Sequence, residues 1–196
     1  MDAAEPLTRA RHLQEWLANV AREDDPWRAR FFAALPTDMR QTIEATSKVE
    51  WLPARMHVVL AEILGEAFGP ARAHAYYRRA FAASLRGPVL GPLLRTGIRI
   101  LGVTPASMIR WAGHGWNSSF RNCGSVSGEL LGPAHGRLLY SGLPAVCTTS
   151  DAWLDSAQGS AYGALDAMGA TGVVRLDKSE RGQGRIVLEV EWIEPK

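Results

Sequence analysis

The chain has 196 residues, of which 46% are hydrophobic and 21% are charged, and its formal net charge is +2. A chain of this size and apolar content can bury a core of ordinary size, which excludes an intrinsically disordered protein. Its longest apolar runs, such as residues 56–64, are interrupted by His57 and Glu62. They fall short of the roughly 20 residues that cross a bilayer, so we expect no transmembrane segment.

The start of the chain and its cysteines indicate a reducing compartment. Residues 1–6 lack the basic region and the apolar stretch of a secretion signal, so we expect the cytoplasm. Cys123 and Cys147 have neither CxxC spacing nor a neighbouring histidine cluster. We therefore expect both to be reduced thiols.

The first half of the chain has the spacing of helices. Apolar residues at three- and four-residue intervals predict helices over 7–21, 26–35, 39–47, 53–64, 71–85, 93–101 and 105–111. We divide the chain into an N-terminal helical extension, residues 1–35, and a single α+β domain that resembles ligand-binding domains, residues 36–196. The extension contains Trp16, Trp27, Phe31 and Phe32. These aromatic residues either extend the core or pair with another subunit, and we expect a homodimer.

Positive charge is concentrated in the middle of the chain. No acidic residue occurs between Glu66 and Glu129, and this interval contains Arg72, Arg78, Arg79, Arg86, Arg95, Arg99, Arg110 and Arg121. Arginine suits bidentate contact with carboxylate or phosphate, so an anionic ligand or partner is conceivable. Nucleic-acid or nucleotide binding through residues 67–128 is the alternative function. The arginines could equally lie on exposed helix faces or pair with acidic residues from the chain ends.

The second half of the chain changes to the spacing of strands. Alternation predicts a strand over 115–123, followed by strands over 125–131 and 136–142, a helix over 151–172, and a closing hairpin of 173–177 and 185–192. Gly159, Gly163 and Gly169 each cost up to about 1 kcal/mol in a helix interior, which indicates that this helix packs closely on the sheet. The order predicts an α+β fold in which N-terminal helices pack on a C-terminal antiparallel sheet.

Several segments carry a family resemblance. Residues 117–124 (NSSFRNCG), 142–144 (GLP), 153–168 and 187–192 (VLEVEW) resemble a paralogous family of domains that is abundant in myxobacteria. That family is similar in architecture to 4-vinyl-reductase-type domains, haem nitric-oxide-binding sensor domains and palmitate-binding vesicle-tethering subunits. The resemblance extends back to about residue 39 and implies a pocket between N-terminal helices and a C-terminal sheet. It implies a ligand-binding or interaction module in signalling.

The haem version of this fold can be compared with the sequence. Haem sensors of the fold use a histidine on the helix before the sheet and a Tyr-x-Ser-x-Arg strand motif. The predicted helix 93–101 contains no histidine, and the strand offers Tyr140-Ser141-Gly142 without the spaced serine and arginine. His114 lies between Gly113 and Gly115, where we expect a loop. The comparison disfavours haem, so we expect no cofactor and no metal site.

No enzyme motif accompanies the resemblance. The sequence contains no GxSxG, P-loop or HExxH, and no GxGxxG after a predicted strand. We expect a non-catalytic cytoplasmic sensor or adaptor that binds a small apolar or anionic ligand, or a signalling protein, between helices and sheet. The expected walls are Trp111, Trp116 and Tyr140, and the expected anion anchors are Arg95, Arg99 and Arg121. Each of these aromatic residues could instead belong to the core.

Overall fold

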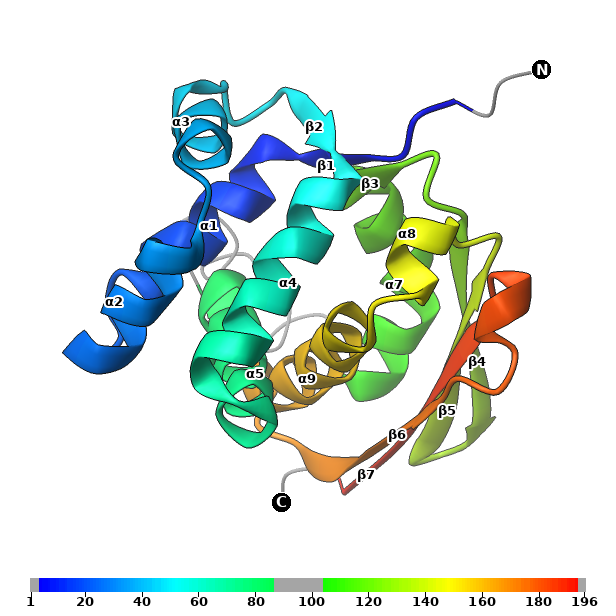
Figure 1. The fold of residues 1–196 in the computed structure, drawn as a ribbon. Coiled ribbons are helices and arrows are strands. Elements are labelled where there is room, and N and C mark those ends of the chain that lie inside the picture. The colour runs from blue at the N-terminus through cyan, green and yellow to red at the C-terminus, as the bar shows by residue number, and fades with distance from the viewer. Residues whose placement is uncertain (1–3, 87–103, 194–196) are drawn as a thin grey trace.

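The computed structural model describes residues 4–86 and 104–193 (Figure 1). Before the gap come helices α1 (Ala10–Val20), α2 (Asp25–Ala34), α3 (Thr37–Ala45), α4 (Ala54–Phe68) and α5 (Pro70–Arg86), and after it α7 (Pro105–Ser119), α8 (Ala145–Thr148) and α9 (Asp151–Ala167). The strands are β1 (Leu7–Arg9), β2 (Trp51–Pro53), β3 (Phe120–Arg121), β4 (Ser125–Gly132), β5 (His135–Ser141), β6 (Thr171–Asp177) and β7 (Ile186–Ile193). No helix of the described residues is both long and apolar enough to cross a membrane.

The strands form two antiparallel sheets, and the predicted α+β class is confirmed. The larger sheet has the order β4-β5-β7-β6, and a smaller sheet has the order β2-β1-β3. Figure 1 shows the larger sheet curved around α7 and α9, with the N-terminal helices on the far side of α9. This arrangement creates one apolar layer between helices and sheet, which is where the resemblance places a pocket.

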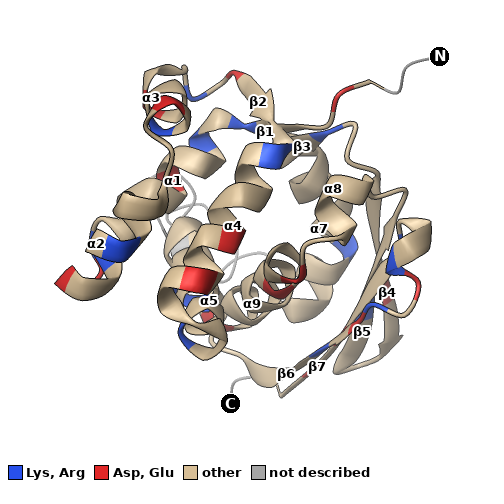
Figure 2. Cartoon of the chain, in the orientation of Figure 1, with Lys and Arg blue, Asp and Glu red and all other residues tan. Residues whose placement is uncertain are grey.

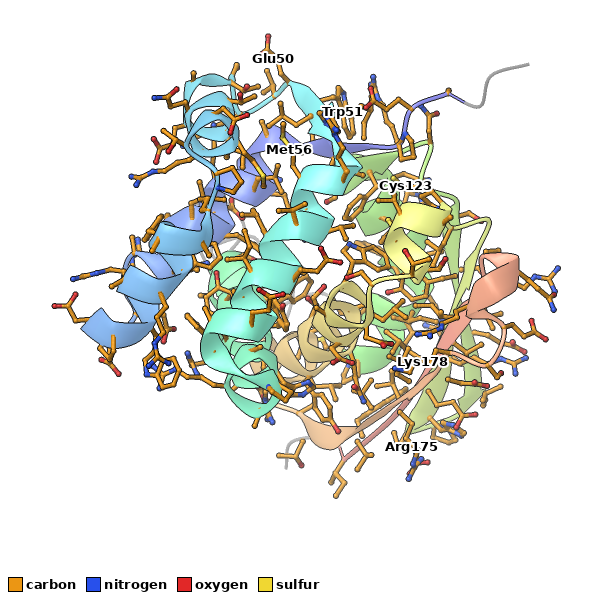
Figure 3. All side chains as sticks on the ribbon, viewed as in Figure 1. Glu50, Trp51, Met56, Cys123, Arg175 and Lys178 are labelled. Carbon is orange, nitrogen blue, oxygen red and sulfur yellow. The ribbon has the colours of Figure 1, made fainter. Side chains whose placement is uncertain are left out.

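The inner face of the larger sheet follows from the two-residue period of its strands. On β7 the side chains of Ile186, Leu188, Val190 and Trp192 are buried, and the residues between them are partly exposed. The outer face carries charges that pair across strands, such as Arg137 with Glu129 and Arg175 with Glu191. Figure 3 shows Arg175 pointing away from the molecule.

Glycines allow the helices to approach their neighbours closely. A Cβ added at Gly159 would lie 2.7 Å from Cβ of Tyr77, and one added at Gly163 would lie 2.4 Å from the carbonyl oxygen of Arg78. The prediction that these glycines bring the helix close to the sheet is wrong at these two positions, because the close neighbour is α5. A Cβ added at Gly128 of β4 would lie 1.8 Å from the carbonyl oxygen of Ile109, so α7 packs directly on β4.

The predicted strand over 115–123 is wrong for most of its length. α7 begins at a capping box formed by Thr104 and Ser107 and continues to Ser119, and only Phe120–Arg121 are extended. Ile109 and Trp116 recur at helical spacing on the inner side of α7, and their packing outweighs the polar alternation of residues 115–119. The predicted helix over 93–101 lies outside the described residues. Residues 7–9, expected to begin a helix, form β1 instead.

The aromatic residues before position 36 extend the core. Trp16 and Phe31 are buried in the main core cluster, and Trp27 and Phe32 pack against it. This packing is one of the two outcomes that the sequence left open for these residues. The domain boundary at residue 35 and the homodimer remain predictions.

Candidate functional site

A cluster of rings fills the space where the helices meet the sheets. This interlayer cluster comprises His12 and Trp16 of α1, His57 of α4, Trp116 of α7, Phe120 of β3, Tyr140 of β5 and Trp153 of α9. The ring centroids of Trp116 and Phe120 are 4.2 Å apart, and those of Trp16 and His57 are 4.5 Å apart. Elements from the whole described chain therefore converge on one aromatic site.

His57 is the polar centre of this cluster. Its ring is 4% exposed, and its Nδ1 accepts a hydrogen bond from the indole nitrogen of Trp153 at 3.1 Å. Because Nδ1 accepts, the proton of the neutral imidazole is on Nε2. That buried Nε2 has no hydrogen-bond partner among the described residues. An unsatisfied buried donor is costly and calls for an acceptor.

Burial keeps this histidine and its neighbour neutral. Desolvation, and then the nearby His12, hold the pKa of His57 well below its ordinary value. The two rings meet edge to face with centroids 4.8 Å apart. Burial, and then Arg11, lower the pKa of His12 to about 4. Both imidazoles are therefore uncharged at neutral pH and present neutral ring nitrogens to the cluster.

The free space beside the cluster is small. A cavity of about 20 Å³ is lined by His12, Trp16 and Tyr77, among others. This volume suits about one water molecule. A larger hollow of about 260 Å³ lies away from the cluster and is lined by Leu17 and Phe32, among others. A ligand much larger than water would have to part the rings of the interlayer cluster.

The structure separates the predicted site residues. Trp116 and Tyr140 belong to the interlayer cluster, and burial raises the pKa of Tyr140 well above its usual value. Trp111 lies on α7 but is 68% exposed, and Arg121 lies on the outer face of the small sheet. Arg95 and Arg99 lie outside the described residues. Of the residues predicted as walls, Trp116 and Tyr140 therefore lie together, and Trp111 lies apart from them.

Sequence reasoning missed the histidines, Trp16, Phe120 and Trp153. A usable signal existed for His57, since it interrupts the apolar run of residues 56–64, and a polar residue within such a run is either paired or functional. The five residues from α1, α4, β3 and α9 are brought together only by the tertiary fold.

The position of His114 corrects another expectation. The helix before the sheet is α7, and His114 lies on that helix rather than in a loop. Gly113 next to it faces β4, where an added Cβ would lie 2.5 Å from the carbonyl oxygen of Val126. The glycine is therefore needed for close packing and does not break the helix. The His114 side chain is exposed, and its ring does not contact the rings of the interlayer cluster.

Both cysteines are free and buried, as expected. The Cys123 thiol donates to the carbonyl oxygen of Leu7 at 3.5 Å, and burial raises its pKa to about 11. Burial, and then Cys123, raise the pKa of Cys147 to about 12. Neither thiol is activated as a nucleophile. Among residues 4–86 and 104–193, no group of three or more His, Cys, Asp and Glu residues is placed to hold a metal ion.

Solved structures share this architecture over nearly the whole chain. An unliganded Fe(II) H-NOX protein, a mutant from K. algicida, matches with a TM-score of 0.62 and 9% identity, over 95% of this chain and 97% of its own. The chain has the H-NOX fold. An H-NOX protein from S. oneidensis in the Fe(II)NO ligation state matches with a TM-score of 0.59 and 12% identity, over 95% of this chain and 99% of its own. No protein-family model and no curated protein matches the sequence.

The comparison overturns the expectation that the chain has no cofactor. A further match, from work on heme distortion in the H-NOX family, has a TM-score of 0.60 and 8% identity and covers 96% of both chains. The matching H-NOX proteins include ones described in an Fe(II) state and in work on heme distortion. The sequence argument examined residues 93–101, which lie outside the described residues, whereas the helix that precedes the sheet is α7.

Proposed function

We propose that this domain is a sensor that binds a small ligand between its helices and its sheet, at His57. The observation that carries the proposal is the buried, neutral imidazole whose Nε2 has no partner among the described residues, in contact with rings from α1, β3 and α9. A binding site needs apolar walls and a few convergent polar groups, and this cluster supplies both. The H-NOX fold supports a sensor role by analogy.

Haem is the first candidate ligand, because matching H-NOX proteins are described in an Fe(II) state and in work on heme distortion. Its binding would require the rings of the interlayer cluster to part, since the cavity beside them is only about 20 Å³. When bound, a haem would supply an iron that takes up a small gas molecule. His57 is the histidine that would hold it, since His114 is exposed and the pocket side of α7 carries Trp116 instead. A neutral imidazole is the form of histidine that can bind a metal ion.

The protonation of His57 links such binding to Trp153. Nε2 offers a lone pair only after its proton moves to Nδ1, and a protonated Nδ1 can no longer accept from the Trp153 indole. The 3.1 Å hydrogen bond between the two rings would therefore break. Trp153 lies in the first turn of α9, which packs on both α5 and the larger sheet. Ligand binding at His57 would in this way remove the hydrogen bond that joins α9 to α4. The loss of this bond is the proposed signal.

The same hydrogen bond favours a second candidate. With Nδ1 accepting from Trp153, Nε2 is already a donor, and a ligand with an acceptor oxygen could bind it directly. The Trp116 indole nitrogen is also buried and has no partner among the described residues. Such a ligand would leave the bond between Trp153 and His57 intact. Haem binding thus requires the hydrogen bond between Trp153 and His57 to break, whereas binding of a ligand with an acceptor oxygen leaves this bond in place.

Haem titration of the purified chain tests the proposal. We expect a Soret band that grows to saturation in the wild type, is lost in His57→Gln, and persists in the matched control His114→Gln. Trp153→Phe should bind haem more tightly, because it removes the bond that holds the wrong tautomer. If His114→Gln abolishes binding and His57→Gln does not, the site is on the other side of α7 and the proposal is wrong. Absence of any Soret band in the wild type rejects haem and leaves the oxygen-acceptor ligand.

The proposal extends to the role, the location and the assembly of the protein. We propose a non-catalytic role, a cytoplasmic location and a homodimer, with a signalling protein as the partner. Nothing among the described residues favours the nucleic-acid alternative. Within the arginine-rich interval, Arg72 and Arg79 pair with Glu23, and Arg78 pairs with Asp166.

A further inference from the structure

The small sheet carries arginines that form no salt bridge among the described residues, unlike most of the other arginines. Most described arginines form salt bridges with carboxylates, on the helices and on the outer face of the larger sheet alike. Arg9 of β1, Arg121 of β3 and Arg55 in the first turn of α4 have none among the described residues. Figure 2 shows Lys or Arg on β1, on β3 and at the start of α4, three elements that lie next to one another. Arg30 on α2 also has no salt bridge among the described residues, but Arg72, the other arginine over its Trp27 ring, is paired with Glu23.

Two of these arginines share one tryptophan ring. The Cζ atom of Arg9 is 3.8 Å from the ring centroid of Trp51, and that of Arg121 is 4.3 Å from the same centroid. Arg9 is aligned with Trp51 across the β1–β2 pair, and its Nε donates to the carbonyl oxygen of Ser118 at 3.3 Å. Its Nη1 donates to the carbonyl oxygen of Val49. No hydrogen bond or salt bridge holds Arg121 among the described residues, so its planar N–H groups are free to bind an anion.

The strand period explains why these residues share a face. Thr8, Leu52 and Phe120 point inward and are buried. Their neighbours Arg9, Trp51 and Arg121 therefore point outward, together with Leu7 and Pro53. We call this outer face, formed by Leu7, Arg9, Trp51, Pro53 and Arg121, the arginine platform. Two like charges beside one ring repel each other, and the ring offsets only part of that cost. A carboxylate bound between them would relieve it.

We propose that the arginine platform is a docking surface for an acidic segment of a partner protein. Tryptophan and arginine are the residues that dominate protein interfaces, and arginine binds carboxylates through two parallel hydrogen bonds. Exposed Val49, at 72%, extends the apolar part of the surface next to Trp51. A partner segment that combines acidic and apolar side chains matches both parts.

The surroundings of the platform favour a protein over a nucleic acid. Glu50 lies beside Trp51, and Figure 3 shows it extending away from the molecule. Glu5, also exposed, precedes β1. A polyanion with regularly spaced phosphates would meet these carboxylates, whereas a peptide can place its acidic side chains between them.

The platform is also joined to the interlayer cluster. Phe120, the residue before Arg121, contacts His57 with a ring-centroid distance of 5.6 Å. The same short strand therefore presents one side chain to the cluster and the next to the platform. The docking proposal does not depend on the ligand proposed for His57, and the two can be tested separately.

Fluorescence anisotropy with the full chain tests the platform. The probe is a fluorescein-labelled peptide rich in glutamate and leucine, with a lysine-for-glutamate version and a single-stranded oligothymidine of matched charge as comparisons. We expect the acidic peptide to bind the wild type and the basic peptide not to bind. Arg121→Glu should weaken binding by at least about tenfold, because a repulsive charge replaces an attractive one. Arg121→Lys should weaken it less, since it keeps the charge but loses the planar fork.

Arg30→Glu is the matched control. Arg30 is also exposed, has no carboxylate partner among the described residues, and stands over a tryptophan, with its Cζ 5.2 Å from the Trp27 ring centroid. We expect this variant to bind the acidic peptide as the wild type does. The proposal is overturned if the wild type does not bind the peptide, or if Arg30→Glu weakens binding as much as Arg121→Glu. It is also overturned if the oligonucleotide binds more tightly than the peptide and this binding needs Arg121.

Discussion

Replacing Gly163 of α9 with alanine tests the helix packing that surrounds the candidate site. A Cβ at this position would lie 2.4 Å from the carbonyl oxygen of Arg78, 3.0 Å from Cβ of Phe81 and 3.1 Å from the backbone nitrogen of Ala82. Two of these three atoms belong to the backbone of α5, which cannot move aside as a flexible side chain would. The alanine therefore has to push the two helices apart.

Two opposed effects determine how far Gly163→Ala changes the free energy of unfolding. Alanine gains about 1 kcal/mol over glycine inside a helix. Overpacking a tight contact costs about 1–3 kcal/mol, and a backbone neighbour places this site toward the upper end. The net loss should be about 1–2 kcal/mol, which lowers the melting temperature by roughly 2–8 °C in a chain of this length.

Gly115→Ala is the control, because Gly115 also lies inside a helix. A Cβ added there meets nothing within 4 Å. We expect only the helix gain, of up to about 1 kcal/mol, and a melting temperature raised by roughly 2–4 °C. Differential scanning calorimetry of both variants provides the measurement. If Gly163→Ala is stabilised as much as Gly115→Ala, α5 and α9 are not in close contact and the packing described for these two helices is wrong.

Three further outcomes are expected. Because the pKa values of His12 and His57 are lowered in the folded protein, the unfolded chain binds more protons than the folded chain at acid pH. The free energy of unfolding is therefore highest above pH 6.5 and falls as the pH falls toward about 4. For His12 this amounts to about 3 kcal/mol, and urea titrations of His12→Gln should show a shallower loss of stability than wild type or His114→Gln. Cys123 and Cys147, with pKa values raised to about 11 and about 12, should resist iodoacetamide in the folded protein and react after unfolding; labelling of either thiol in the folded chain would contradict their burial. Trp153→Phe should cost about 1 kcal/mol or more in the free energy of unfolding, since it removes the hydrogen bond to His57 and leaves a second ring nitrogen unpaired; an unchanged urea midpoint would count against that bond.

Local patterns predicted most of the sheet and most of the helices. The alternation in β7 and the helical spacing in α4 each report a single apolar face, which the tertiary structure preserves. The pattern failed where two periods overlap. Residues 115–119 alternate like a strand, yet Trp116 also fits the helical stripe that begins at Ile109, and the packing of α7 on β4 favours the helix.

The candidate site could be predicted only in part, for a physical reason. Trp116 and Tyr140 were expected to line it, and both are members of the interlayer cluster. The partner of His57 is Trp153, which is 96 residues distant in sequence. No local spacing encodes such a contact, so the unsatisfied Nε2 that carries the functional proposal can be seen only once α4 and α9 are packed together.

The most direct test of a ligand site at His57 is the ¹⁵N spectrum of the histidine rings in the labelled full chain. In the free protein, His57 should show a protonated Nε2 and an unprotonated Nδ1. On addition of haem, or of a ligand with an acceptor oxygen, the His57 nitrogens should shift or broaden while those of exposed His114 stay unchanged. A spectrum in which a bound ligand perturbs His114 and leaves His57 unaffected would contradict the account.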